Sequence, residues 1–145
     1  MSAPLQVHAS CVARSGEGVL IAGPSGSGKS DLALRLLNRG FTLVSDDRTD
    51  IDSGIARPPA AIAGLLEVRG LGVLRLPFAP EAKLRLLVKL GEDTPRLPAS
   101  EHDPETGLPV VRIAAMTPSA ADRVIVALDC VCGRVPQLAG AFADE

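Results

Sequence analysis

A run of glycine and serine that ends in a lysine is the part of this sequence best suited to chemistry. Gly23 is followed by four residues and then by Gly28, Lys29 and Ser30, the spacing of the phosphate-binding pattern G-x-x-x-x-G-K-[ST]. Glycines in such a loop let successive backbone N–H groups converge on phosphate oxygens, where a side chain would hold the anion away. The predicted phosphate-binding residues are Gly23, Pro24, Ser25, Gly26, Ser27, Gly28, Lys29 and Ser30.

The segments on either side of this loop support a nucleotide site. Residues 19–23 are apolar and predict a short central strand, and the leucine-rich residues 30–40 predict a helix that ends at a glycine. A helix that begins at the lysine points its unpaired N–H groups and its positive dipole end at bound phosphates. Lys29 then reaches the terminal phosphates, and the Ser30 hydroxyl ligates Mg²⁺. We expect this arrangement rather than a flexible glycine–serine turn.

Two adjacent carboxylates, Asp46 and Asp47, end the next predicted strand, residues 41–47. In a parallel sheet the end of this strand lies at the same edge as the phosphate loop. One carboxylate can orient Mg²⁺ or its water, and the other can accept a proton from an incoming hydroxyl. The alternative is a solvated turn at a strand end.

Strands and helices alternate along the chain, which predicts an α/β fold in a single domain, residues 1–145. Residues 5–13 indicate one strand that can pair as a hairpin with residues 19–23. Residues 91–109 are rich in Pro, Asp and Glu and predict a long exposed loop. Further predicted elements are two short extended pieces in 49–57, a short helix and glycine-interrupted apolar pieces in 58–78, strands at 82–90 and 110–116, and a helix in 117–133 capped by Thr117 or Ser119.

Composition excludes several classes of function. The formal net charge of -2 lacks the basic excess expected of a nucleic-acid-binding face, and three Phe without Trp or Tyr offer no platform for stacking bases. No apolar run approaches the roughly 20 residues that span a bilayer, and the N-terminus lacks the pattern of a signal peptide. We therefore expect a cytoplasmic protein with no membrane partner. Cys11, Cys130 and Cys132 do not have zinc-site spacing and are expected to be buried free thiols.

Two motifs together point to a family. At residues 23–47 (GPSGSGKSDLALRLLNRGFTLVSDD) and 65–74 (LLEVRGLGVL) the sequence resembles the catalytic domain of HPr kinase/phosphorylase. That family carries G-x-S-G-x-G-K-S-[ED], then R-G, then a hydrophobic stretch closing in D-D, and later E-[IV]-R-G-[LI]-G. All of these occur here in order. The resemblance implies a P-loop nucleotide-binding core with a mixed sheet, similar to HPr kinase and PEP carboxykinase.

The resemblance also implies a reaction and its residues. Members use ATP and Mg²⁺ to phosphorylate a serine of the phosphocarrier protein HPr, and many run the reverse phosphorolysis. By position, Lys29 would act on the ATP phosphates, Asp47 would be the catalytic base, and Ser30, Asp46 and Glu67 would hold Mg²⁺. His8 would match a catalytic histidine before the loop, and Arg96 an active-site arginine.

Some family features are open in this chain. The sequence begins almost at the catalytic strand, which resembles a short proteobacterial form that lacks the N-terminal domain and serves a nitrogen-related branch, so the carrier is expected to be HPr or its nitrogen-branch paralogue. The basic, glycine-containing segment that the family uses in phosphorolysis has no match in residues 116–124. Kinase activity is therefore expected, and the reverse reaction is left open. Members form hexamers, which implies a homo-oligomer.

Two other functions fit the phosphate loop. A P-loop kinase for a small metabolite would also place acids after its second strand, although it usually carries an arginine-rich lid, and residues 91–109 contain only Arg96. A regulatory module that senses ATP without transfer would need the loop but not Asp47. A signalling GTPase is disfavoured, because the sequence has no Asn-Lys-x-Asp motif.

Overall fold

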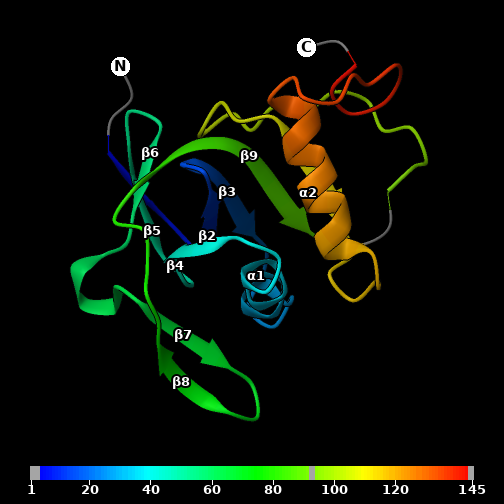
Figure 1. Ribbon diagram of the computed structural model, residues 1–145. Helices are drawn as coiled ribbons and strands as arrows, with labels where there is room; N and C mark the ends of the chain where they lie inside the picture. The colour runs from blue at the N-terminus through cyan, green and yellow to red at the C-terminus, as the bar shows by residue number, and fades with distance from the viewer. Residues whose placement is uncertain (1–3, 92–93, 144–145) are drawn as a thin grey trace.

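The computed structural model describes residues 4–91 and 94–143. Its elements, in chain order, are β1 (Leu5–Val7), β2 (Ala9–Arg14), β3 (Glu17–Ala22), α1 (Lys29–Leu37), β4 (Thr42–Ser45), β5 (Thr49–Asp52), β6 (Ile55–Arg57), the 3₁₀ helix η1 (Ala60–Ile62), β7 (Leu65–Val68), β8 (Gly72–Arg75), β9 (Ala82–Leu90), β10 (Val110–Ile113) and α2 (Ala120–Val131). The predicted α/β fold with a mixed sheet is confirmed (Figure 1).

One mixed sheet organises the molecule, with strand order β1-β5-β6-β9-β3-β2-β4. Strand β3 is parallel to β9 and antiparallel to β2, and β2 is antiparallel to β4, so β3 and β4 run in the same direction. Strand β10 pairs in parallel with the second half of β9, while β6 pairs with its first two residues. Strands β3, β4, β9 and β10 therefore all end at one edge of the sheet.

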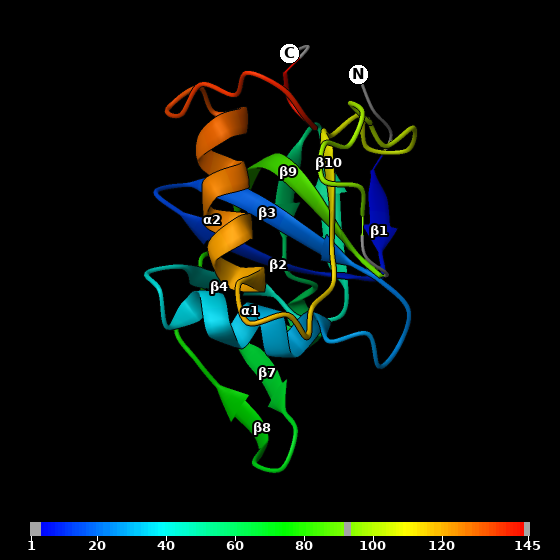
Figure 2. The same ribbon diagram turned by 90° about the vertical axis from the view of Figure 1, so that its right-hand side faces the viewer.

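Both faces of the sheet are covered, which explains why residues 19–22 are apolar without alternation. Val19 and Ile21 pack into the core beneath the two helices, while Leu20 between them packs into a second core on the opposite face. The helical face is filled by residues such as Leu36 and Leu128, both fully buried. Figure 2 shows α1 and α2 lying on this face.

Helix α1 forms where the sequence predicted it. Leu32, Ala33 and Leu36 share its buried face, and Asp31 lies in the first turn, where a carboxylate complements the helix dipole. The helix ends before Gly40, whose φ of 93° is the left-handed conformation that a glycine adopts without strain.

Strands β7 and β8 form an antiparallel hairpin separate from the main sheet, and it projects beyond α1 in both views (Figures 1 and 2). Only Leu66 of the hairpin strands is buried, whereas Val73 on β8 and Leu71 at the turn are exposed. The glycine-interrupted pattern of residues 58–78 thus corresponds to η1 followed by this hairpin.

Three expectations were wrong in detail. Residues 5–13 do not form one strand: the chain bends at His8, β1 pairs with β5 at the sheet edge, and only β2 joins the predicted hairpin with β3. Cys11 is buried, but Cys130 and Cys132 are only partly so. Ser119 occupies the cap position of α2, yet neither it nor Thr117 caps the helix with its side chain; the Thr117 hydroxyl donates to the Ala114 carbonyl.

The predicted loop 91–109 contains no helix or strand over its described residues, but it is not uniformly exposed, and His102 bridges to Pro109. No helix in the described part of the chain has both the length and the apolar character that crossing a bilayer requires.

Candidate functional site

The glycine–serine loop connects the end of β3 to the start of α1, the context that the phosphate-binding pattern requires. Gly26 and Gly28 have φ values of 81° and 102°, in the region that disfavours other residues. A Cβ atom on Gly23 would lie 2.5 Å from the Oγ of Ser27, so this position also has no room for a side chain. The sequence therefore needs glycine at three positions of the loop for steric reasons.

Lys29, the first residue of α1, is buried against the loop that precedes it. Its ammonium donates to the carbonyl oxygens of Gly23 at 2.9 Å and Pro24 at 3.3 Å. The ammonium thus lies inside the curve of the loop, at the place where the loop would meet an anion.

Asp46 is the centre of the hydrogen-bond network next to the loop. Its side chain is buried, and its Oδ1 accepts hydrogen bonds from the hydroxyls of Ser30 at 2.7 Å and Ser10 at 2.8 Å. Its Oδ2 accepts the backbone N–H of Glu67 at 3.3 Å. The carboxylate therefore connects the start of α1, strand β2 and the β7–β8 hairpin. The sequence placed Asp46 at the loop edge by assuming a parallel sheet; the sheet is mixed, but β4 runs with β3, so the edge is the same.

Asp47 has the opposite environment. It is exposed, and its φ of 69° is a left-handed conformation, which is uncommon outside glycine but tolerated best by Asp and Asn. Its backbone N–H donates to the Oγ of Ser10 at 3.1 Å. The two neighbouring acids are thus divided into a buried carboxylate with three donors and an exposed one held by its backbone.

Ser10 is a site residue that sequence reasoning missed. It is fully buried in β2, and its hydroxyl donates to Asp46 and accepts from the Asp47 N–H. The available signal was a polar residue inside an otherwise apolar strand, but its partners lie 36 and 37 residues away in the chain. Their proximity follows from the β2–β4 pairing, which the sequence pattern does not specify.

The structure brings the other predicted residues to the site unequally. Glu67 reaches it through its backbone, and its side chain on β7 is exposed. His8 is exposed at the bend before β2, two residues from Ser10. Arg96 is exposed in the segment that follows β9, and within the described residues no hydrogen bond or ion pair joins it to residues 23–30.

An ionic network fixes the segment after β9 to strands β9 and β10. The Lys89 ammonium lies 3.4 Å from the Asp103 carboxylate, and Arg112 on β10 forms a bidentate pair with Glu101. The Arg112 hydrogen bonds hold the pKa of Glu101 below its ordinary value. Partial burial raises the pKa of Asp103, but hydrogen bonds from Thr106 and the nearby Lys89 outweigh it, so that the net shift is downward. Both carboxylates are therefore ionised at neutral pH and pin the segment to the sheet.

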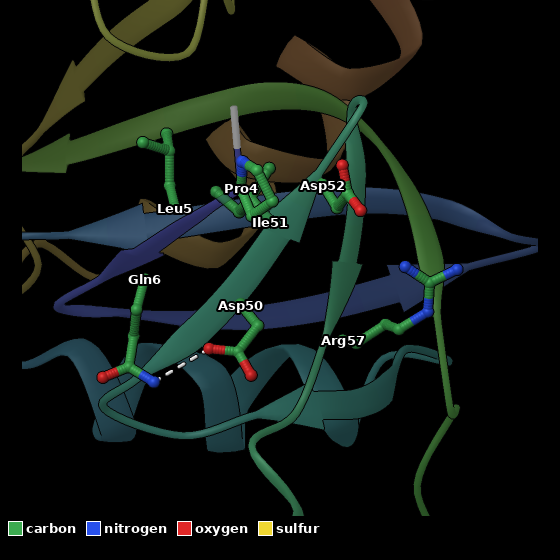
Figure 3. A pocket seen from close by; sticks show the side chains of 7 residues that line it. All are labelled: Pro4, Leu5, Gln6, Asp50, Ile51, Asp52 and Arg57. Carbon is green, nitrogen blue, oxygen red and sulfur yellow. Dashed lines mark hydrogen bonds between the residues drawn. The ribbon is translucent and has the colours of Figure 1, made fainter. Parts of the chain in front are cut away.

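Two hollows of the surface lie away from the glycine loop. One of about 340 Å³ lies over β1, β5 and β6 and is lined by Pro4, Leu5, Gln6, Asp50, Ile51, Asp52 and Arg57 (Figure 3). The Gln6 amide there donates to Asp50 at 2.8 Å. A second, of about 370 Å³, lies between residues 94–101 and β10. Neither contains a residue of the glycine loop, so chemistry rather than cavity size identifies the candidate site.

The fold and this loop define a class: an α/β protein whose mixed sheet carries a glycine-rich phosphate-binding pattern between a central strand and a helix. Residues 1–89 match the family model of the HPr Serine kinase C-terminal domain. The chain belongs to this family. The matched range includes the loop, both aspartates and Glu67, but neither Arg96 nor α2.

Individual relatives agree with the family. The chain is 40% identical to the HPr kinase/phosphorylase of Aromatoleum aromaticum (strain DSM 19018 / LMG 30748 / EbN1), in an alignment that covers 88% of this chain. That alignment covers 46% of the relative, so the chain spans about half of its length. Among solved structures, the Hpr(Ser) kinase/phosphatase from Coxiella burnetii matches with a TM-score of 0.69 and 23% identity, covering 84% of this chain and 86% of that one. The shared fold is thus established by structure and the family by sequence.

Proposed function

We propose that this chain is an ATP-dependent kinase domain that transfers a phosphoryl group to a serine of the phosphocarrier protein HPr or a nitrogen-branch paralogue. The observation that carries the proposal is the hydrogen-bonded set Ser30–Asp46–Ser10–Asp47 at the end of the glycine loop. It places one buried and one exposed carboxylate beside the predicted phosphate site. Family membership supports the same reaction class.

Residues 23–30 would bind the ATP phosphates. The loop backbone and the N-terminus of α1 offer N–H donors, and the Lys29 ammonium would exchange its two carbonyl partners for phosphate oxygens. The buried Ser27 hydroxyl supports this fit, because it has no hydrogen-bond partner among the described residues. A buried unpaired hydroxyl is costly, and a phosphate oxygen in the loop would satisfy it.

Ser30, Asp46 and Glu67 are the residues proposed to hold Mg²⁺. Their hydroxyl and carboxylate oxygens are the ligands that Mg²⁺ prefers, with phosphate oxygens and water completing the coordination. Ser30 and Asp46 already lie together at 2.7 Å. Bound there, the ion would neutralise charge that develops on the phosphate oxygens during transfer.

Asp47 is the proposed catalytic base. As the serine Oγ of the acceptor attacks the γ-phosphorus, its proton passes to the Asp47 carboxylate; the new O–P bond forms while the bond to the β-phosphate breaks, and its electron pair leaves on the β-phosphate oxygen. Exposure lets a protein substrate reach this carboxylate. The unusual backbone conformation and the Ser10 contact hold it in place.

The remaining roles belong to the same proposal. His8 and Arg96 are assigned to acceptor and phosphate contacts, and both are exposed: His8 directly precedes β2, and Arg96 lies in the segment that follows β9. A cytoplasmic location and assembly into a homo-oligomer are part of the same proposal, and the resemblance to the family supports both.

The test is phosphoryl transfer to HPr, measured by intact mass spectrometry of HPr after incubation with ATP, Mg²⁺ and the chain. We expect one phosphoryl adduct with the wild-type chain and none with Asp47→Asn, a substitution that tolerates the left-handed backbone. Asp52→Asn, at the exposed last position of β5, is the matched control and should transfer normally. If wild type gives no adduct on HPr yet transfers the γ-phosphoryl group of ATP to the hydroxyl of a small metabolite, the protein is a metabolite kinase. ATP binding without any transfer would instead indicate a sensor.

A further inference from the structure

The arrangement of the sheet edge indicates where the nucleoside part of ATP must lie; this step rests on the proposed function. Asp46, Asp47 and the β7–β8 hairpin all lie on the β4 side of the glycine loop. The metal and the catalytic base act at the terminal phosphate, so the triphosphate points its γ end toward this side. The nucleobase of ATP must therefore leave the loop on the opposite side, past β9 and toward the end of β10.

The chain after β10 occupies that position and contacts the loop. A Cβ built on Gly28 would lie 3.1 Å from the Cβ of Ala115, so the segment 114–117 packs directly against the last glycine before α1. Figure 2 shows the chain between β10 and α2 passing beside α1.

This segment is held rigidly. Arg35 of α1 donates to the carbonyl oxygens of Ala115 and Thr117, and its Nε lies 3.2 Å from the Asp31 carboxylate. The Thr117 N–H and hydroxyl both donate to the carbonyl of Ala114, which closes a turn. Contacts from both ends therefore fix the residue between them, Met116.

Met116 is 87% exposed in this fixed turn. A large apolar side chain that is exposed to solvent contributes no burial of apolar surface to the stability of the free protein. A thioether packs well against an aromatic face and adapts to its shape. Beside a phosphate loop, the aromatic group in question is the nucleobase.

We propose that Met116 packs against the base of the nucleotide and that the segment 114–117 forms one wall of the base site. The phosphates, bound by the loop and Lys29, would make no use of Met116. Its contribution is thus to affinity for the nucleoside, and it is separable from the anion site.

The experiment compares two ligands by isothermal titration calorimetry: a non-hydrolysable ATP analogue and inorganic tripolyphosphate, each with Mg²⁺. Met116→Ala should weaken binding of the analogue about 2- to 10-fold, the range expected for a lost sulfur–aromatic contact, and leave tripolyphosphate binding unchanged. Met116→Leu should restore most of the affinity. Leu138→Ala, at a side chain that is 96% exposed, is the control and should change neither affinity.

Each result has one meaning. If Met116→Ala binds the analogue as wild type does, or loses affinity for both ligands equally, the base contact is wrong while the proposed kinase function stands. If the wild-type chain binds neither ligand, the proposed function fails, and this inference fails with it. Equal melting temperatures of the variants would show that the substitutions leave the fold intact.

Discussion

Asp46 and Asp47 are neighbours in the sequence with opposite environments, because the Asp46 carboxylate is buried among hydrogen-bond donors and the Asp47 carboxylate is exposed. The three donors of Asp46 hold its charge in place and offset the cost of burial. Among the described residues, the one hydrogen bond of Asp47 is that of its backbone N–H, so its carboxylate is left exposed. The backbone strain at Asp47 is of the kind that clusters at functional sites. Asp46 and Asp47 are the same residue type, so their positions in the hydrogen-bond network distinguish the roles proposed for them.

Ser10 should matter more to transfer than to stability. We expect Ser10→Ala to lower the free energy of unfolding by about 1–3 kcal/mol, because it leaves buried polar groups without a partner, and also to reduce phosphoryl transfer as Asp47 loses its anchor. Thr49→Val is the matched control: Thr49 is equally buried and donates to the Ala9 carbonyl at 2.9 Å, a hydrogen bond that involves neither acid. Urea denaturation and the transfer assay together test this. Equal loss of transfer in the two variants would show that Ser10 acts through stability alone.

A substitution of Gly23 tests the claim that the loop has no room for a side chain at this position. In Gly23→Ala the new methyl would meet Ser27 at 2.5 Å and the Leu90 Cβ at 3.1 Å, so the loop must shift. Overpacking of this kind costs about 1–3 kcal/mol, and we expect roughly a 10-fold or greater loss of affinity for an ATP analogue in calorimetry. Gly91→Ala, where nothing lies within 4 Å of the added Cβ, should bind normally. Unchanged binding in Gly23→Ala would mean that the loop relaxes freely.

At this scale the position of the glycine loop between a strand and a helix could be predicted from the sequence, because the loop pattern is local. Gly23 to Ser30 are contiguous, and the flanking apolar segments confirm their context. Ser10 and the contrast between Asp46 and Asp47 were not predictable, since both depend on the long-range pairing of β2 with β4.

Among the elements, the C-terminal end of α2 is attached to the β2–β3 hairpin by ion pairs. Arg134 pairs with Glu17 at 2.8 Å and with Asp129 at 2.8 Å, while Arg14 of β2 also reaches Asp129 at 2.9 Å. The Arg134 hydrogen bonds hold the pKa values of Glu17 and Asp129 below their ordinary values of 4.5 and 3.8. These contacts join the helix to the β2–β3 hairpin and keep α2 over the sheet.

This attachment predicts a pH dependence of stability. A carboxylate whose pKa is lowered by folding stabilises the protein at pH values above its unfolded pKa, and the contribution disappears as pH falls through the folded value. Arg134→Gln should therefore lower the melting temperature at pH 7, and the difference should shrink as the pH falls below the lowered pKa values of Glu17 and Asp129, where the carboxylates are protonated in both variants. Arg75→Gln, on exposed β8, controls for the loss of one positive charge. A melting-temperature difference that is the same at pH 7 and pH 3 would contradict the assignment.

Elements with a clear period or strong end signals were predicted well, as α1 and β9 show. The single strand predicted at residues 5–13 was wrong, because the amino-acid composition does not change at the bend and so gives no sign of a break there. Nothing local indicates that Leu5–Val7 pairs with β5 while Ala9–Arg14 pairs with β3 and β4. Pairing partners far along the chain decide where that strand breaks.

At the scale of the whole molecule, stability and function are distributed unevenly. Strands β3 and β9 lie at the centre of the sheet with both faces buried, whereas the β7–β8 hairpin lies outside it and buries only Leu66 among its strand residues. The Leu76 N–H donates to the Gly64 carbonyl at 2.7 Å and closes the base of the hairpin, and the Ala79 N–H donates to the Leu43 carbonyl of β4 at 2.8 Å, which ties the chain just after the hairpin to the sheet. Along β7, the Glu67 N–H donates to Asp46. The site is therefore built between the most and the least buried parts of the fold.

Amide hydrogen exchange followed by mass spectrometry can test this coupling, because local opening is easiest where few apolar contacts hold a segment. We expect peptides from β3 and β9 to exchange slowest and those from β7–β8 much faster. Asp46→Ala removes the acceptor of the Glu67 N–H, so it should accelerate exchange in the hairpin and leave β3 and β9 nearly unchanged. Asp47→Asn, which keeps that acceptor, should leave the hairpin as in wild type. Faster exchange throughout the sheet in Asp46→Ala would instead make Asp46 a residue of global stability, and the hairpin would then not be a separately opening part of the site.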